Sequence, residues 1–135
     1  MCGIVGYIGN EQAADIVLKS LQRLEYRGYD SAGIATVSDG ELHLIRSVGK
    51  LNNLAALLKV RAQPGHIGIG HTRWATHGGV NEQNAHPHIA GERVAIVHNG
   101  IIENYVSLKD QLTFEGHEFK SDTDSCLLYT SDAAD

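Results

Sequence analysis

The sequence predicts one α+β domain in which amphipathic helices pack on hairpin-linked strands. Short apolar runs rich in β-forming residues recur along the chain, and the first of them is Ile4–Ile8. Elsewhere, apolar residues recur at helical spacing with charged residues opposite them, as in Ala14–Leu24. Asp39-Gly40 separates two further β-type runs, and this pair is a strong signal of a β-hairpin. Helices and hairpin strands in one short chain indicate the α+β class.

The composition is that of a globular domain and argues against several kinds of partner. Of the 135 residues, 42% are hydrophobic and 20% are charged, which supports one packed core. The net charge is −5 and the basic residues are scattered, so we expect no nucleic-acid partner. No apolar run approaches the roughly 18–20 residues of a membrane span, and none resembles a signal peptide. We therefore expect no membrane association and a cytoplasmic protein whose two cysteines, Cys2 and Cys126, remain thiols.

The first half of the chain is expected to form a strand, a helix and a hairpin in turn. Ile4–Ile8 predicts a buried strand with Cys2 at its mouth. Asn10 is a candidate cap for a helix that packs on the sheet through its leucines and valine. A loop of mixed composition then leads to the two hairpin strands, Gly33–Val37 and Glu41–Val48.

The second half is less regular. Leu51–Leu58 has the spacing of a short helix, and Ile67–Thr72 alternates apolar residues with glycine, as a strand does where another backbone or a ligand comes close. Residues 73–92 show no hydrophobic period, and a structureless connection of about twenty residues is usually functional. Val94–His98 is expected to be a strand and Ile101–Leu112 a helix.

Cys2 is the first candidate for a catalytic group. If Met1 is removed, this residue carries both a thiol and a free α-amine. An α-amine has a pKa of about 7.7–8.0 in general, so it can accept a thiol proton near neutral pH. Gly3 leaves room for a substrate to approach the backbone. The alternative is an ordinary first strand whose second residue is a cysteine, and position alone favours that alternative.

Asn99-Gly100 has two equally good interpretations. Asn-Gly after a β-type run is typical of a hairpin turn. If the pair instead faces Cys2, an amide side chain and a glycine N–H are the donors that an oxyanion hole uses. The helical spacing after Gly100 weakens the hairpin interpretation.

Arg73 is followed by an aromatic residue and a hydroxyl, Trp74 and Thr76, and then by His77. The planar guanidinium is suited to bind a carboxylate, although an Arg-Trp pair is more often a surface contact. Asp122 and Asp124 could hold an ammonium group, but capping a helix is their default role.

Five histidines suggest a metal site, since imidazole is the usual zinc ligand. They are His71, His77, His86, His88 and His98. None has the His-x-x-x-His spacing that puts two ligands on one helix face. We therefore expect no metal and no cofactor.

Five blocks of sequence, in the same order, resemble one known family. They are Met1–Gly6, Leu24–Gly33, Gly70–Gly78, Asn84–His88 and Val97–Asn104. These blocks look like the N-terminal glutaminase domain of glutamine:fructose-6-phosphate aminotransferases, which is a class II glutamine amidotransferase. The Tyr-Arg-Gly-Tyr-Asp-Ser sequence favours this family over phosphoribosylpyrophosphate amidotransferases, which usually carry His-Arg-Gly-Gln-Glu there. The resemblance implies an N-terminal-nucleophile hydrolase fold, a four-layer αββα sandwich of antiparallel sheets.

The resemblance also implies a reaction. Cys2 would be the nucleophile, with its own α-amine as the base, and Arg27 would lie near the thiol. Asn99 and the N–H of Gly100 would form the oxyanion hole. Attack on the side-chain amide of glutamine would release ammonia and leave a γ-glutamyl thioester, which water hydrolyses to glutamate.

The same resemblance implies how glutamine is held. Arg73 would clamp the α-carboxylate, with Thr76 and His77 lining that pocket, and Asp124 would hold the α-ammonium. Trp74 would lie on the mobile loop that covers the bound glutamine. This agrees with the residue types, because a dipolar amino acid needs one cationic and one anionic anchor.

The resemblance extends over residues 1–124, whereas residues 125–135 do not fit the Thr-Glu-led helix with which the family continues. We expect this tail to be an assembly or adapter artefact. The chain would then be the first part of the domain, without the isomerase domains that bind fructose 6-phosphate, and the full-length enzyme would be a homo-oligomer. The alternative is a catalytically silent fragment, because half a sandwich would not hold the site within the ~0.5 Å that catalysis needs.

Overall fold

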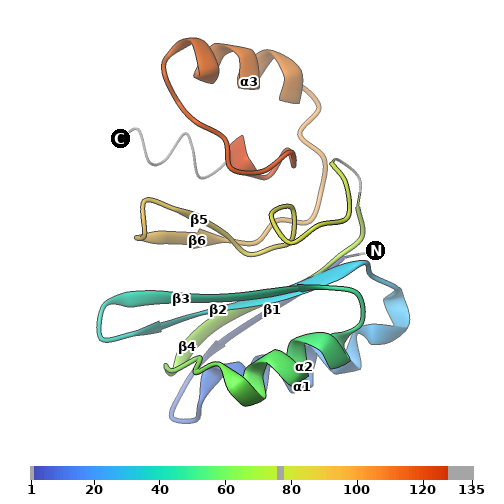
Figure 1. Cartoon of the computed structure of the whole chain (residues 1–135), viewed down its shortest axis with the longest axis vertical. Helices are drawn as coiled ribbons and strands as arrows, with labels where there is room; N and C mark the ends of the chain where they lie inside the picture. The colour runs from blue at the N-terminus through green and yellow to red at the C-terminus, as the bar shows by residue number, and fades with distance from the viewer. Residues whose placement is uncertain (1, 76–77, 128–135) are drawn as a thin grey trace.

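The computed structural model describes residues 2–75 and 78–127, with every side chain in these ranges except that of Arg27. Within them, two antiparallel sheets lie one above the other with helices on their outer sides (Figure 1). The larger sheet contains β1 (Gly3–Ile8), β2 (Ser31–Ser38), β3 (Glu41–Val48) and β4 (Ile67–Arg73), and the smaller contains β5 (His88–Ala90) and β6 (Val94–Ile96). The helices are α1 (Ala13–Arg23), α2 (Leu51–Val60) and α3 (Tyr105–Phe114), with a 3-10 turn η1 (Glu25–Arg27). This order of layers, α-β-β-α, confirms the predicted α+β class.

The larger sheet has the strand order β1-β4-β2-β3, and every neighbouring pair is antiparallel. A tight hairpin joins β2 to β3, with positive φ at both Asp39 (52°) and Gly40 (75°). Two successive residues with positive φ define a type I′ turn, whose twist matches that of the strands. The hairpin prediction is therefore confirmed.

The ends of three neighbouring strands lie side by side at one end of this sheet. Gly3 pairs with Thr72, and Ser31 pairs with Arg73. The starts of β1 and β2 therefore lie beside the end of β4. Cys2, which directly precedes β1, is placed at this end, as the sequence predicted.

The helices α1 and α2 cover the outer face of the larger sheet (Figure 1). None of the helices in the described ranges is long and apolar enough to cross a membrane. The buried core between sheet and helices consists of Val17, Leu21, Ala32, Ile34, Ile45, Leu51 and Leu54. Gly70 permits the close approach of α1, because a Cβ at this position would collide with Val17 and lie 3.1 Å from Leu21. The closest neighbours of Gly70 are therefore side chains of α1, whereas the sequence predicted another backbone or a ligand.

The predicted cap of α1 is wrong. The helix begins at Ala13, and no side chain caps it. The Ala13 N–H instead donates to the carbonyl of Gly65 at 2.9 Å. The N–H of Glu11 donates to the Tyr7 hydroxyl at 3.0 Å, so the residues after Asn10 form a turn. Tertiary contacts satisfy the backbone donors for which a capping side chain was expected.

The second half departs further from the predicted elements. A short strand, β5, forms within the segment that was expected to be irregular, and β6 ends before His98. The backbone of His98 is hydrogen-bonded to the side chains of His86 and His71 instead of to a strand. The helix α3 begins later than expected, because the N–H of Ile102 donates to the carboxylate of Asp124. Side chains therefore replace regular backbone pairing in this part of the chain.

Candidate active site

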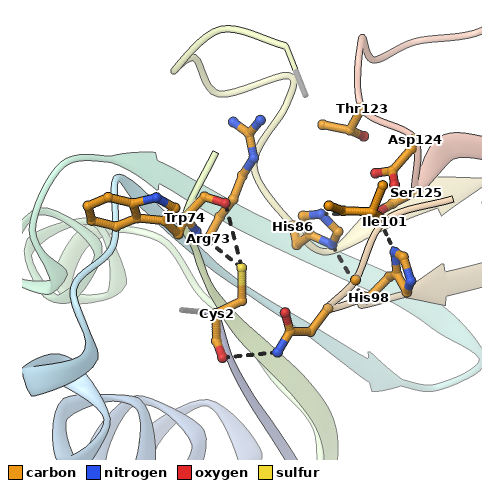
Figure 2. Close-up of a pocket in the computed structure, with 11 residues that line it drawn as sticks. Cys2, Arg73, Trp74, His86, His98, Ile101, Thr123, Asp124 and Ser125 are labelled. Carbon is orange, nitrogen blue, oxygen red and sulfur yellow. Dashed lines mark hydrogen bonds between the residues drawn. The ribbon is translucent and has the colours of Figure 1, made fainter. Parts of the chain in front are cut away.

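A cavity of about 210 Å³ opens where the strand ends of the larger sheet meet the irregular segments that follow it (Figure 2). Its lining comes from five separate parts of the chain: Cys2, Arg73, Trp74, His86, His98, Asn99, Gly100, Ile101, Thr123, Asp124 and Ser125. Six of the nine predicted site residues are among them: Cys2, Arg73, Trp74, Asn99, Gly100 and Asp124. Residues about a hundred positions apart in the sequence therefore share one cavity.

The thiol of Cys2 lies at the edge of this cavity. The Trp74 N–H donates to its sulfur at 3.2 Å, and the sulfur contacts the Trp74 carbonyl oxygen at 3.7 Å. The next residue is held to the sheet, because the Gly3 N–H donates to the buried Thr72 hydroxyl at 3.1 Å. The backbone of Trp74 thus offers the sulfur one hydrogen-bond donor and one acceptor. These contacts hold the thiol at the edge of the cavity, and its role as nucleophile stays a prediction.

Asn99 lies directly beside Cys2. Its Nδ2 donates to the Cys2 carbonyl oxygen at 3.3 Å. After Gly100 the chain enters a turn and then α3, and no strand returns to pair with β6 there in the described residues. The hairpin interpretation of Asn99-Gly100 is therefore wrong, and the oxyanion-hole role stays a prediction.

The side chain of Arg73 is buried, and it is bonded to its own loop. Its guanidinium donates to the carbonyls of Gly79 at 3.0 Å and Gly78 at 3.4 Å, and lies 3.9 Å from an Asp30 carboxylate oxygen. Figure 2 shows the guanidinium extending away from the thiol. Asp30 also accepts from the Ala75 N–H at 2.5 Å and donates its own N–H to the Arg73 carbonyl at 2.7 Å. Asp30, which was not predicted as a site residue, therefore connects Arg73 to the start of its loop.

Asp124 and Trp74 lie at different depths of the site. Asp124 is buried, and its Oδ2 accepts from the Ile102 N–H at 2.7 Å. Trp74 is 55% exposed, and a Cβ on Gly28 would lie 3.2 Å from its ring. The buried position of Asp124 is compatible with binding the substrate ammonium, and the exposed position of Trp74 is compatible with covering the bound glutamine. Both roles remain predictions. Asp122, the other acidic candidate, does not line this cavity.

Three predicted site residues cannot be placed in the same way. Thr76 and His77 lie outside the described residues. The backbone of Arg27 ends η1, but its side chain also lies outside the described part of the chain. Their roles stay predictions from the resemblance.

Three buried histidines lie together: His71, His86 and His88. The rings of His71 and His86 are stacked with centroids 4.0 Å apart, and His88 lies 4.4 Å from His86. Burial lowers the pKa of His71 to about 4 and that of His88 to about 3. The pKa of His86 is lowered even further, mainly by burial and to a smaller extent by the neighbouring His71. All three are therefore neutral at pH 7. Among the residues that the structure describes, no group of three or more His, Cys, Asp or Glu could hold a metal ion.

Five residues line the cavity without having been predicted as site residues: His86, His98, Ile101, Thr123 and Ser125. The two histidines were considered only as metal ligands. One signal was available in the sequence, because His98 directly precedes Asn99 and Ser125 directly follows Asp124. Adjacency to a candidate functional residue therefore carried more information than metal-ligand spacing.

Solved structures with the same architecture include a glutamine amidotransferase. The glutamine phosphoribosylpyrophosphate amidotransferase of B. subtilis, complexed with ADP and GMP, superimposes with a TM-score of 0.83 at 27% identity, over 96% of this chain and 28% of that one. The allosteric regulatory enzyme of purine biosynthesis gives 0.82 at 29% identity, over 95% of this chain and 28% of that one. The fold, together with a thiol at the mouth of its first strand, defines the class II amidotransferases with an N-terminal-nucleophile hydrolase fold.

Residues 59–131 match the family of glutamine amidotransferase domains. This match spans more than half of the 135 residues, and the chain belongs to that family. The match also passes residue 124, where the resemblance was expected to stop. The origin of residues 125–135 stays a prediction.

The proteins that are similar in sequence identify a narrower family than the similar structures do. Isomerizing glutamine–fructose-6-phosphate aminotransferases are 60% identical in Thermosynechococcus vestitus, over 95% of this chain and 21% of the relative, and 58% identical in Nostoc sp., over 95% and 20%. The protein of that name in Pyrococcus horikoshii is 54% identical over 95% of this chain and 22% of the relative. The chain thus spans about a fifth of the length of these relatives. The predicted resemblance to this family is confirmed.

Proposed function

We propose that this chain is the glutaminase part of a glutamine:fructose-6-phosphate aminotransferase, which releases ammonia from L-glutamine for the synthesis of glucosamine 6-phosphate. One observation carries the chemistry: Cys2 and Asn99 line the same cavity, with the Asn99 amide 3.3 Å from the Cys2 carbonyl oxygen. The choice of family rests on identity. Relatives with this name are 54–60% identical, whereas the two enzymes of known structure described above are 27–29% identical.

The proposed reaction begins after removal of Met1. The α-amine of Cys2 accepts the thiol proton, and the sulfur attacks the side-chain amide carbon of glutamine, with Arg27 nearby. Asn99 releases the Cys2 carbonyl and donates, with the Gly100 N–H, to the oxygen on which negative charge develops. The carbon–nitrogen bond then breaks, and the proton held by the amine leaves with the nitrogen as ammonia. Water hydrolyses the γ-glutamyl thioester to glutamate and restores the thiol.

The substrate would be held by charges of opposite sign. Arg73 and Asp124 line the same cavity and provide the cation and the anion that an amino acid requires. We assign Arg73, with Thr76 and His77, to the α-carboxylate, and Asp124 to the α-ammonium. Trp74 would cover the bound glutamine, which would exclude water from the reacting amide until the ammonia has left.

The remaining steps would belong to other parts of a longer protein. Isomerase domains would bind fructose 6-phosphate and accept the ammonia, in a homo-oligomeric enzyme of the cytoplasm. A reducing compartment suits the reaction, because the nucleophile must remain a thiol. The glutaminase step needs no metal or other cofactor, since attack, charge stabilisation and proton transfer are all assigned to side chains and backbone.

The test combines intact mass with glutamate release from glutamine. We expect the chain to lack Met1 and to release glutamate, and we expect Cys2→Ala to lower the rate by roughly 10⁴-fold or more, as loss of a nucleophile does. Cys126→Ala is the matched control. This second cysteine does not line the cavity, and burial raises the pKa of its thiol to about 11.

Glutamate release that persists in Cys2→Ala at the rate of the control would overturn the proposal. If a folded chain without Met1 releases no glutamate, it is a catalytically silent fragment of this family.

A further inference from the structure

The residue before the proposed oxyanion pair is held by buried side chains on both faces of its peptide backbone. The N–H of His98 donates to Nδ1 of His86 at 3.3 Å, and the His98 carbonyl accepts from Nε2 of His71 at 3.0 Å. His71 is fully buried and His86 is 4% exposed, and their rings stack on each other. His98 is therefore held by two buried imidazole rings.

The side chain of His98 is held as well. Its Nδ1 lies 3.0 Å from the Ser125 hydroxyl, which in turn lies 3.4 Å from Nε2 of His86 (Figure 2). Because Nδ1 of His86 accepts a hydrogen bond from the His98 backbone N–H, this neutral ring carries its proton on Nε2, and the Nε2–H donates a hydrogen bond to the Ser125 hydroxyl. The hydroxyl then donates to the His98 ring. The hydrogen bonds thus form a closed ring, from His98 backbone to His86, to Ser125 and back to the His98 side chain.

This ring acts on the next two residues of the chain. The His98 imidazole lies against Gly100, since a Cβ on Gly100 would be 3.0 Å from Nε2 of His98. Asn99 lies between these two residues in the sequence. In the described part of the chain its side chain donates one hydrogen bond, to the Cys2 carbonyl. An oxyanion hole works only when its donors are held in place before the reaction, so that no reorganisation is needed.

We propose that Ser125, which lies within the family match of residues 59–131, acts through His86 and His98 as a positioning residue. It would hold Asn99 and the Gly100 N–H in the geometry of an oxyanion hole. This inference rests on the glutaminase function proposed above. It concerns the two steps in which charge develops on the carbonyl oxygen, formation and hydrolysis of the thioester, because glutamine binding is assigned to other residues and the thiol is held by Trp74.

The alternative is that the hydroxyl only satisfies buried polar atoms. The chain offers a matched control, because Ser121 is a second buried serine in the same segment. Its hydroxyl donates to Asn84 at 3.1 Å, and it does not line the cavity. Loss of either hydroxyl removes one buried hydrogen-bonding group, so both substitutions are expected to lower stability similarly.

The experiment compares Ser125→Ala, Ser125→Thr and Ser121→Ala in the full chain. The readouts are kcat and KM for glutamine hydrolysis and the rate at which iodoacetamide alkylates Cys2. We expect Ser125→Ala to lower kcat about 10-fold with KM within 2-fold, which is less than the 10²–10³-fold of deleting a donor outright. Alkylation passes through no oxyanion, so its rate should not change. Ser125→Thr keeps the hydroxyl and should restore kcat, and Ser121→Ala should leave it unchanged.

An equal loss of kcat in Ser125→Ala and Ser121→Ala, or no recovery in Ser125→Thr, overturns the inference. If the unsubstituted chain is inactive, the proposed function fails separately. Amide hydrogen exchange then tests the positioning by itself: Ser125→Ala must accelerate exchange at Gly100 relative to Ser121→Ala, and equal exchange refutes it.

Discussion

The two halves of this molecule are stabilised by different kinds of contact. In residues 3–73 most of the buried side chains are apolar, and seven of them form the cluster between the larger sheet and its two helices. In residues 78–127 most of the buried side chains are polar, and they include Asn84, His86, His88, Ser121, Thr123, Asp124 and Ser125. Apolar burial is non-directional, whereas hydrogen bonds require defined geometry. The first half is therefore a scaffold, and the second is a network that determines where individual atoms lie.

The candidate site lies where the two kinds of structure meet. The scaffold supplies Cys2 and Arg73 at its strand ends, and the polar half supplies Asn99 and Asp124. The comparison leads to a rule that can be tested: changes in the scaffold should alter stability, and changes in the network should alter chemistry or pH dependence.

The largest expected effect is the loss of the polar half in acid. The folded-state pKa values of His71 and His88, about 4 and about 3, lie below the value of about 6.5 expected for unfolded histidine. Between pH 6.5 and 4 the unfolded chain binds more protons, so stability is complete above pH 6.5 and is lost as the pH falls. Each histidine contributes about 1.4 kcal/mol per pH unit in this window. The pKa of His86 is lowered as well and adds to the same trend.

Hydrogen exchange at pH 7, 6 and 5 measures this effect by region. We expect β5, β6 and the end of β4 that carries His71 to lose protection before β3 and α2, which serve as the internal control. Stability that is constant from pH 7 to pH 5 would contradict the assignment of neutral, buried histidines.

A core substitution in the scaffold should have the next largest effect. Leu21 is fully buried under the sheet, so Leu21→Ala should cost about 3 kcal/mol of unfolding free energy, measured by urea titration. The matched control is Leu18→Ala on the same helix, where the side chain is only partly buried and the cost should be smaller. KM for glutamine should stay within about 2-fold in both variants. A large change in KM would contradict the rule that changes in the scaffold alter stability alone.

A charge substitution in the network should alter substrate binding with little change in stability. Asp124→Asn keeps an oxygen that can accept from the Ile102 N–H but removes the negative charge. Since a hydrogen bond to a charged group is worth about 1.5–3 kcal/mol, KM for glutamine should rise roughly 10–100-fold. Asp122→Asn is the control, because the neighbouring carboxylate does not line the cavity. Equal KM values in the two variants would remove Asp124 from the ammonium site.

The smallest effect is expected on the outer helix of the polar half. Phe114, at the end of α3, is 93% exposed, and α3 has no buried residue. Phe114→Ala should therefore change the unfolding free energy by less than about 0.5 kcal/mol in the urea titration used for Leu21. A loss comparable with that of Leu21→Ala would show that this ring is covered in solution.

The scaffold could be predicted from the sequence because its signals are local. The Asp39-Gly40 turn, the leucine spacing of α1 and α2 and the glycines of β4 each report on a few neighbouring residues. The structure reproduces the hairpin strands to within two residues of the predicted limits. The predicted Asn10 cap of α1 was wrong because the first N–H of the helix donates to the carbonyl of Gly65, which is far along the chain.

The candidate site was predictable in part. Cys2, Arg73, Asn99, Gly100 and Asp124 could be named from residue types and from the resemblance, and all five line one cavity. The supporting contacts of Asp30 and Ser125 could not be named. The residues next to Asp30 do not indicate that its carboxylate accepts a hydrogen bond from a loop 45 residues away. Those next to Ser125 do not indicate that its hydroxyl bridges two histidines.

By itself, the sequence determined the class of fold and the family, because periodicity, turn chemistry and motifs are properties of short stretches. The reactive groups that it names stay predictions. Only the tertiary structure decided that Asn99-Gly100 leads into a turn and not a hairpin, and that His71 and His86 stack as neutral rings. It also decided that His98 is held by side chains from three other segments. The physical reason is that directional hydrogen bonds between distant residues have no periodic pattern in the sequence.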